Sequence, residues 1–360
     1  MRKLEIPLID VKMLFKNVNY LTSQFVVSSN EYKDFLRFAG GFINSQGDGK
    51  GYTIANQILI YGFNSRARLC YDESTWNNMG VTVIKPEEPI HIMEKAGTKE
   101  GYRDRIIYDI SATNAAPLQE NNSPEPGTMC ELLMKAAPCK IEFNRKQASG
   151  MANYNYEQNI ITVGKGFKGF EHIFMELSSV YGHYYMAKDD NSKHNENYER
   201  KIKSASSGKP VYKDTYLKYV DGRYYECSEN DIVKSESGGK LFIISQDPGG
   251  SRYKIPVIKK QIQIPPGEIK IPQFTYKKAT HREEAAGISY MVSTAAGLDT
   301  SIYSDFQNLK WRDMEYTDVR KSLEKIVNIG RTIKHNYDVK LNDLIIANSS
   351  SVSNYESEVV

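Results

Sequence analysis

The sequence contains no long apolar run. No stretch of its 360 residues approaches the 18 or more apolar residues that a membrane-spanning helix requires. The first residues, MRKLEIPLIDVKMLFKN, also lack the apolar core of a secretory signal peptide. We therefore expect a protein with no membrane partner, located in the cytoplasm.

Cysteine is scarce and scattered. The four cysteines are Cys70, Cys130, Cys139 and Cys227, and no two of them form a C-x-x-C pair. This spacing argues against a zinc knuckle and against a disulfide framework. A reducing compartment is the best fit to such usage.

Positive and negative charges are nearly balanced, with 47 Lys and Arg against 44 Asp and Glu. The formal net charge of +3 is too small to indicate a nucleic-acid-binding protein by itself. The distribution is uneven, however, because residues 191–280 hold 17 Lys and Arg against 10 Asp and Glu. Such a stretch either contacts phosphates or forms a solvated surface. The 25 tyrosines leave a similar choice, since tyrosine stacks on bases but is also common on strands and at interfaces.

The pattern along the chain predicts an α+β fold with two domains. Residues 1–28 alternate apolar and polar positions, which favours an N-terminal arm or a strand. Residues 29–115 predict helices at 31–43 and 52–63, followed by a small antiparallel sheet. The segment ATNAAPLQENNSPEPGT, rich in Asn, Pro and Ala, indicates a linker at 116–128.

The second domain is predicted at 129–338. It begins with a helix, a strand and a hairpin, and continues with a long helix at 168–188 and later helices at 281–297 and 317–337. Short strands between these helices indicate a β-rich insertion at 190–275. Residues 339–360 are a polar tail for which disorder is expected.

The stretch from residue 52 to residue 114 resembles the N-terminal domain of ArdC-type antirestriction proteins. In that family a helix with a Ser/Thr…Asn pair precedes a Trp, a Gly, a Val-Lys-x-Gly-Glu turn and an aromatic-Asp-[Ile/Val]-Ser-x-Thr stretch. The order and spacing are kept here along this stretch, at Thr53, Asn56, Trp76, Gly80, Val83, Lys85, Glu87 and Asp109-Ile110-Ser111. One departure is the turn Ile84-Lys85-Pro86-Glu87-Glu88, where the family often has Lys-Lys-Gly-Glu-Lys.

This resemblance implies binding of single-stranded DNA. A cationic groove would follow the phosphates, and aromatic side chains would stack on bases. Tyr61 is a further candidate for stacking, and Trp76 has an alternative role as a core residue that holds the sheet on the helices. The candidate DNA-binding residues are Tyr52, Asn56, Arg66, Arg68, Tyr71, Trp76, Lys85 and Lys95.

The segment HIFMELSSVYGH resembles the metal-binding helix of the zincin-like metallopeptidase domain in ArdC-like proteins. There a His-Glu-Leu-Ala-His-x-x-Gly-His motif binds zinc, and its Glu acts as general base. Here Glu176, Gly182 and His183 remain, whereas the ligand positions hold Met175, Ser179 and, on a later helix, Ala286. A thioether and a hydroxyl do not replace two imidazoles as zinc ligands.

We therefore expect no metal, no cofactor and no peptidase activity, with Glu176 and His183 as vestiges of a catalytic motif. A relocated site on the same helix is excluded, because His172 and His183 lie three turns apart, roughly 16 Å along the axis. The usual reading of such a face is a polar helix surface with satisfied histidines.

The resemblances lead to two main hypotheses. The first is a DNA-binding accessory protein of a mobile element, such as a conjugative element or a phage. It would bind single-stranded DNA without sequence preference and protect it after entry into a bacterial host. The second is an interaction module that binds a host defence protein or an element-encoded protein without cleaving it. A metallopeptidase with unusual ligands is a third, which metal analysis would decide.

Overall fold

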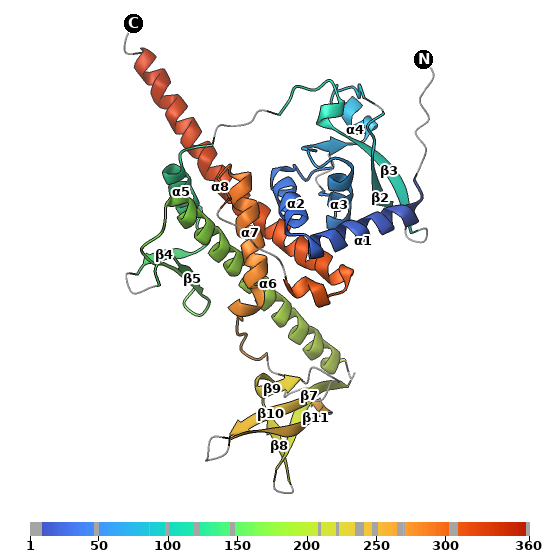
Figure 1. Cartoon of the computed structure of the whole chain (residues 1–360), viewed down its shortest axis with the longest axis vertical. Helices are drawn as coiled ribbons and strands as arrows, with labels where there is room; N and C mark the ends of the chain where they lie inside the picture. Colours follow the sequence, from blue (N-terminus) through green and yellow to red (C-terminus); the bar gives the residue numbers. More distant parts are fainter. Residues whose placement is uncertain are drawn as a thin grey trace. The chain divides into compact units, whose positions relative to one another are not determined.

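The computed structural model describes residues 9–46, 50–85, 87–97, 101–118, 123–144, 148–207, 210–220, 223–234, 241–246, 251–264, 269, 271–301 and 309–357. The fold is α+β, as predicted (Figure 1). Unit 1 comprises Met1–Lys188 with Lys277–Val360, and unit 2 comprises Asp189–Tyr276. Unit 2 spans the segment expected as an insertion. The predicted domain 29–115 and the predicted domain 129–338 without its insertion lie together in unit 1.

The N-terminal residues form a helix and not the arm or strand expected for 1–28. Helix α1 (Val11–Val27) begins after Asp10, whose side chain accepts the N–H of Lys12 at 2.9 Å. Its buried residues recur every three or four positions, which is the period of a helix and not of a strand. They are Leu14, Val18, Thr22 and Phe25. Residues 1–8 lie outside the described residues.

Two further helices follow close to the predicted positions. Helix α2 (Ser29–Gly41) is capped by Ser28, which accepts the N–H of Glu31 at 3.3 Å, and not by Asn30. Helix α3 (Ile54–Phe63) packs on α1 and on the neighbouring sheet, so three consecutive residues are buried: Ile58, Leu59 and Ile60.

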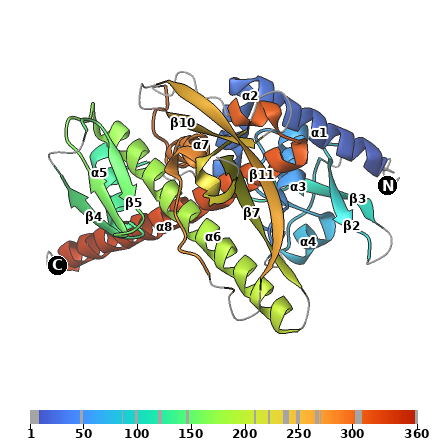
Figure 2. The same ribbon diagram turned by 90° about the horizontal axis from the view of Figure 1, so that it is seen from below.

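The first sheet has the strand order β1-β3-β2 and is antiparallel. Its strands are β1 (Cys70–Tyr71), β2 (Ile90–Lys95) and β3 (Tyr102–Asp109). Beyond these strands, the segment VTVIK (81–85) makes one isolated bridge, between Val83 and Thr113. Helix α4 (Glu73–Asn78) joins β1 to that bridge, and Figures 1 and 2 both show α3 and α4 beside β2 and β3.

The next elements of unit 1 are a helix and a second small sheet. Helix α5 (Pro126–Lys135) begins inside the expected linker, of which residues 119–122 lie outside the described residues. The sheet has the order β4-β6-β5, with β4 parallel and β5 antiparallel to β6. Its strands are β4 (Lys140–Phe143), β5 (Ala152–Asn155) and β6 (Ile160–Val163), as the predicted strand and hairpin required.

The remaining helices of the chain are α6 (Phe170–Ser206), α7 (Arg282–Ala295) and α8 (Tyr316–Ser357). Helix α6 continues well beyond the predicted end at residue 188, and ion pairs four residues apart support this extension, such as Asp189–Lys193 at 2.7 Å. Helix α8 continues to Ser357, so residues 339–357 are helical and not disordered; residues 358–360 lie outside the described residues.

Helix α7 packs on both α2 and α8, and small residues allow this close approach. A Cβ at Gly40 of α2 would lie 3.0 Å from the backbone oxygen of Met291 on α7, and one at Gly330 of α8 would lie 2.8 Å from its sulfur. Arg331 of α8 donates to the backbone oxygen of Ala39 at 3.1 Å and to the side chain of Gln57 at 2.8 Å. The first and last helices thus share one core, which explains why the two predicted domains form one unit.

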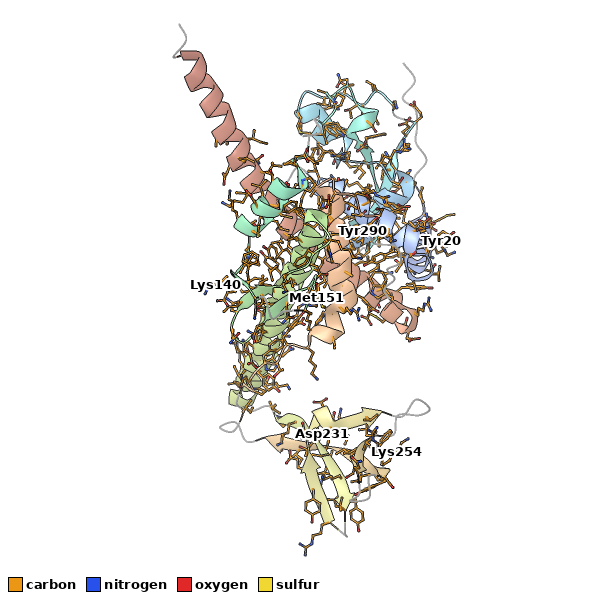
Figure 3. All side chains as sticks on the ribbon, turned by 60° about the vertical axis from the view of Figure 1, so that its left-hand side comes forward. Tyr20, Lys140, Met151, Asp231, Lys254 and Tyr290 are labelled. Atoms are coloured by element: carbon orange, nitrogen blue, oxygen red, sulfur yellow. The ribbon has the colours of Figure 1, made fainter. Side chains whose placement is uncertain are left out.

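Unit 2 contains a five-stranded antiparallel sheet with the order β8-β7-β11-β10-β9. Its strands are β7 (Val211–Val220), β8 (Arg223–Cys227), β9 (Ile232–Lys234), β10 (Leu241–Gln246) and β11 (Arg252–Ile264). Figure 3 shows its side chains, including Lys254 on β11. Few described side chains of the sheet are almost fully buried: Val211, Thr215, Phe242 and Val257.

Candidate functional site

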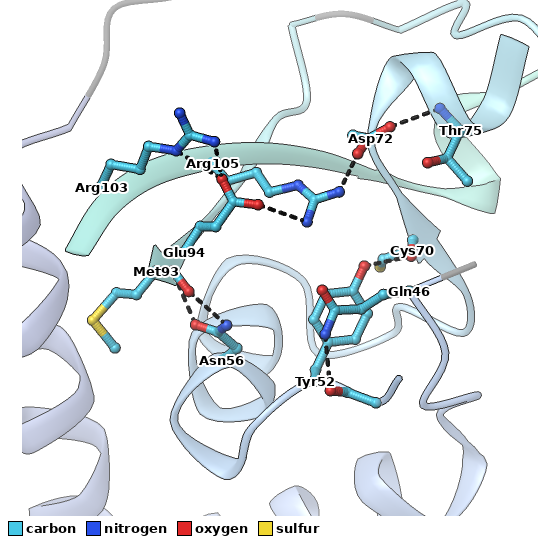
Figure 4. A network of polar contacts seen from close by, with 11 residues as sticks. Gln46, Tyr52, Asn56, Cys70, Asp72, Thr75, Met93, Glu94, Arg103 and Arg105 are labelled. Carbon is cyan, nitrogen blue, oxygen red and sulfur yellow. Dashed lines mark hydrogen bonds and ion pairs between the residues drawn. The ribbon is translucent and has the colours of Figure 1, made fainter. Parts of the chain in front are cut away.

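The Thr…Asn pair of the N-terminal motif holds helix α3 against strand β2. The Thr53 hydroxyl caps the helix by accepting the N–H of Asn56 at 3.3 Å. The Asn56 amide then both donates to the carbonyl oxygen of Met93 and accepts its N–H, each at 2.9 Å (Figure 4). Asn56 is buried, so its amide is occupied by the scaffold and is not available to a strand of DNA.

Arg105 links β3 to its surroundings in the same network. Its guanidinium bridges Asp72, the N-cap of α4, and Glu94 on β2, with 3.1 Å to the latter (Figure 4). Burial alone would raise the pKa of Asp72, but hydrogen bonds from Arg105 and Thr75 outweigh this effect and hold the pKa at about 2. The Arg105 charge is therefore largely neutralised within the protein.

The aromatic residues predicted to stack on bases are core residues. Tyr52 and Tyr71 are buried, and Trp76 is 2% exposed. The Tyr52 hydroxyl donates to the carbonyl oxygen of Cys70 at 2.6 Å, and the Trp76 indole donates to that of Tyr108 at 3.0 Å. Buried rings that pack edge-on, as Tyr71 and Trp76 do at 4.9 Å, offer no face to a base. The stacking prediction is corrected here, and the alternative core role of Trp76 fits the structure.

The Asp-Ile-Ser motif fixes the segment that carries two predicted arginines. The Asp109 carboxylate accepts the N–H groups of Arg68 at 2.7 Å and of Leu69 at 3.2 Å. It also accepts the N–H and the hydroxyl of Ser111, at 3.0 and 2.5 Å. Since Asp109 is buried, this motif positions the backbone around Arg68 and does not itself reach solvent.

Two adjoining hollows of about 440 and 590 Å³ lie in unit 1; Arg66 lines the smaller one and Arg68 lines both. We call these hollows the arginine cleft. Its cations are Arg37, Arg66, Arg68 and Lys334, and its acids are Asp34 and Asp338.

Two of the four cations in the arginine cleft pair with its two acids. Arg37 contacts Asp34 at 2.5 Å, and Lys334 contacts Asp338 at 2.5 Å. Four cations against two acids give the lining of the cleft a net positive charge. Arg66 and Arg68 are both exposed, and Arg68 Nε donates to the carbonyl oxygen of Gly41 at 3.1 Å.

The other two predicted cations lie elsewhere. Lys85 pairs with Glu88 at 3.4 Å in the turn whose Pro86 lies outside the described residues. Lys95 lines a different cleft of about 510 Å³, together with the acids Glu94 and Glu324. Tyr61 is buried on the wall of the arginine cleft, where its hydroxyl donates to Glu31 at 3.2 Å.

Sequence reasoning missed Arg37 and Lys334 as members of this site. Arg37 lies on α2 and Lys334 on α8, almost 300 residues apart in the chain. Only the packing of α2 and α8 around α7 brings them together. Their helical spacing carries no signal for a shared site.

The segment HIFMELSSVYGH lies in α6 and is packed against α7. Met175 is buried, and its carbonyl oxygen accepts the hydroxyl of Ser289 at 2.6 Å. A Cβ at Gly182 would lie 3.1 Å from Ile288, so the retained glycine of the motif permits this helix contact. Ala286 also lies on α7 and offers no ligand atom.

The charges around Glu176 do not suit a metal ion. The Glu176 carboxylate accepts the N–H of Ala152 on strand β5 at 3.3 Å. On the same strand, the side chain of Asn153 accepts a hydrogen bond from Lys278 at 2.7 Å. Desolvation lowers the pKa of Lys278, and the Glu176 carboxylate opposes this shift, so the two charges act on each other. No group of three or more His, Cys, Asp or Glu in the described part of the chain is arranged to hold a metal.

His183 is neutral in this environment. It is 3% exposed, and burial, with the charges of Lys278 and His281, lowers its pKa to about 3. A neutral, buried imidazole one turn beyond Ser179 is part of the packing of α6. His172 is partly exposed and accepts the N–H of Lys168 at 3.4 Å.

The solved structures that resemble this chain include two of the antirestriction ArdC protein from the R388 plasmid. The metal-free structure gives a TM-score of 0.45 at 11% identity, covering 89% of this chain and 97% of that chain. The Mn(II)-bound structure gives 0.43 at 9% identity with the same coverage. The sequence matches no protein-family model and no curated protein. Among the described residues, no helix is both long and apolar enough to span a membrane.

The buried His183 predicts a loss of stability in mild acid. In the unfolded chain this imidazole has an ordinary pKa near 6.5 and takes up a proton below that pH, whereas in the folded chain it stays neutral down to about 3. Stability is therefore unaffected above pH 7 and is lost as the pH falls from 6.5 towards 3, by about 2 kcal/mol between pH 7 and pH 5.

Urea unfolding at several pH values measures this loss. His183→Gln should lose about 2 kcal/mol less than the natural protein over this interval. The matched control His172→Gln, on the same helix, should keep the natural pH dependence. Equal slopes for His183→Gln and the natural protein would refute the assignment.

Proposed function

We propose that this chain binds single-stranded DNA without sequence preference through the arginine cleft. The observation that carries the proposal is the convergence of Arg66 and Arg68 with Arg37 and Lys334 on one surface. Phosphates of a flexible single strand can follow such a cationic hollow, whereas the buried aromatics behind it provide rigidity. Asp109 supports this role, because it fixes the backbone of Arg68.

The biological role that goes with this binding is protection of incoming DNA. The motifs from Thr53 to Ser111 resemble those of ArdC-type antirestriction proteins, which supports an accessory function on a mobile element in the bacterial cytoplasm. We further propose that the chain has no peptidase activity. The support is the replacement of imidazole ligands by Met175 and Ser179, together with the ammonium of Lys278 beside Glu176.

A fluorescence-anisotropy titration with a labelled single-stranded 30-mer tests the proposal. Arg66→Ala/Arg68→Ala should weaken binding about tenfold or more at low salt. It should also reduce the slope of log K against log salt by about 1.4, since each phosphate contact on a single strand contributes about 0.7. Binding to the duplex should be weaker than to the single strand.

The matched control is Lys85→Ala/Lys95→Ala, which removes the same charge outside the arginine cleft. It should leave the affinity within about threefold of the natural protein. An equal loss in both double variants would mean that the whole surface charge and not the cleft attracts DNA. If the natural protein binds no oligonucleotide at micromolar concentration and co-purifies with another protein, the chain is an interaction module instead.

A further inference from the structure

The sheet of unit 2 has two chemically different faces. Side chains alternate along each strand, and directly paired residues share a face. Pairing of Tyr216 with Lys259 and of Lys218 with Tyr225 places these four side chains on one face. Alternation adds Tyr212 on β7, Arg223 on β8 and Tyr253 on β11. We call this the tyrosine face.

The opposite face carries exposed aliphatic side chains together with cations, because pairing and alternation also place Lys213, Lys254 and Lys260 there. It holds Ile244, Ile258 and Ile262, each exposed by about 40–50%. Tyr219 and Tyr224 also lie there, paired across β7 and β8 with ring centroids 4.9 Å apart. We call it the isoleucine face. On the tyrosine face, the most exposed large apolar side chains are all tyrosines. They are Tyr212, Tyr225 and Tyr253, whose exposed fractions are 45% to 50%.

Cations and rings are neighbours on the tyrosine face. Lys218 stands directly opposite Tyr225, and Lys259 stands directly opposite Tyr216, 6.0 Å from its ring centroid. The only acid on this face among the described strand residues is Asp214, which pairs with Lys259 at 2.7 Å. Lys218 and Arg223 add to the positive charge, so the face as a whole is cationic.

We infer that the tyrosine face binds single-stranded nucleic acid. Tyrosine rings accept any base by stacking, and the cations opposite Tyr216 and Tyr225 meet the phosphates that accompany the bases. From Tyr253 to Gln263, β11 extends for ten residues, roughly 33 Å, which suits a site of several nucleotides. On the tyrosine face this strand contributes Tyr253 and Lys259, and β7 and β8 add the other rings and cations, which suits binding without sequence preference. This inference deepens the proposed function by adding a second contact surface for the same strand.

The test compares two pairs of tyrosines in the full chain. Tyr225→Ala/Tyr253→Ala removes two exposed rings from the tyrosine face, and the matched control Tyr219→Ala/Tyr224→Ala removes two similarly exposed rings from the isoleucine face. Titration with a labelled single-stranded 30-mer should show about tenfold or greater weakening for the first pair. The control should change the affinity by less than about twofold, and circular dichroism should show both variants folded.

A second measurement places the strand directly. Photo-crosslinking of a bromouracil-substituted 30-mer, followed by peptide mapping, should label peptides that contain Tyr212, Tyr225 or Tyr253. Parallel titrations with DNA and RNA 30-mers identify which nucleic acid the face prefers. Labelling confined to unit 1, or equal weakening by both tyrosine pairs, would overturn the inference. A third result would also overturn it: the protein self-associates, Tyr219→Ala/Tyr224→Ala abolishes this self-association, and Tyr225→Ala/Tyr253→Ala leaves nucleic-acid binding intact.

The outcomes also separate this inference from the arginine cleft. Loss of binding in Arg66→Ala/Arg68→Ala with no loss in Tyr225→Ala/Tyr253→Ala supports the cleft and rejects the tyrosine face. The reverse result supports the tyrosine face and rejects the cleft. Absence of binding in the natural protein rejects both.

Discussion

Asp109→Ala should destabilise the protein by about 3–5 kcal/mol. The carboxylate is buried and accepts three backbone N–H groups and one hydroxyl, from Arg68, Leu69 and Ser111. Its removal leaves these donors without a partner away from water, which costs about 1–3 kcal/mol for each group that stays unsatisfied. Water that enters the space lowers the sum. Urea unfolding, with the shift read from the midpoint at constant m, measures this loss.

Hydrogen exchange distinguishes a local from a general effect of Asp109→Ala. The amides of Arg68, Leu69 and Ser111 should lose protection first, because their acceptor is gone. Asp34→Ala is the matched control, since this half-exposed acid lies in the arginine cleft and should change stability by less than about 0.5 kcal/mol. Unchanged protection of the three amides in the Asp109 variant would show that the carboxylate does not position this segment.

Trp76→Ala should cost about 3–5 kcal/mol, the usual loss for a buried large aromatic side chain. The ring is 2% exposed and packs with Tyr71, Tyr108 and Ala112, and its indole N–H donates to the carbonyl oxygen of Tyr108. The deleted volume lies inside the cluster, where the sheet and α4 meet. A thermal or urea unfolding curve gives the loss directly.

Trp76→Phe separates this structural role from base stacking. It keeps most of the buried ring and should leave the affinity for single-stranded DNA within about twofold, while the unpaired carbonyl oxygen of Tyr108 costs about 1–3 kcal/mol of stability. If the folded Phe variant instead lost most of its DNA affinity, Trp76 would have to contact bases after all. That result would restore the stacking role predicted from the sequence.

Elements with strong local signals were predictable from the sequence. The α+β class follows from the alternation of apolar helices such as α3 with short β-rich strands such as β2. The hairpin of β5 and β6 was equally predictable, because turn residues separate two alternating segments. Helix α1 was not predicted from the sequence. Its buried Leu14, Val18 and Phe25 follow the helical period, but the exposed apolar Phe15 and Tyr20 obscure that period. The polar surface of α8 beyond residue 339 concealed a helix in the same way.

The candidate site was predictable only in part. Arg66 and Arg68 were candidates because they could supply positive charge within the resembling stretch, and both line the same hollow. The sequence could not separate an exposed ring from a buried one. Trp76 and Tyr71 lie beside residues that alternate in the same manner as an exposed strand, and only the packing of α4 on the sheet decides their burial. Arg37 and Lys334 depend on contacts between distant helices, which no local pattern records.

The contact of the first three helices with α8 has a consequence for how the chain is made. At about 5–20 residues per second, roughly 15 to 55 seconds pass between the synthesis of Phe63 and that of Tyr337. Throughout this interval α8 is not yet made, so the apolar side chains of α1, α2 and α3 that pack on it stay uncovered. Unit 2 is translated inside this interval and makes its strand pairs within itself. Its sheet can therefore close before α8 completes the core of unit 1.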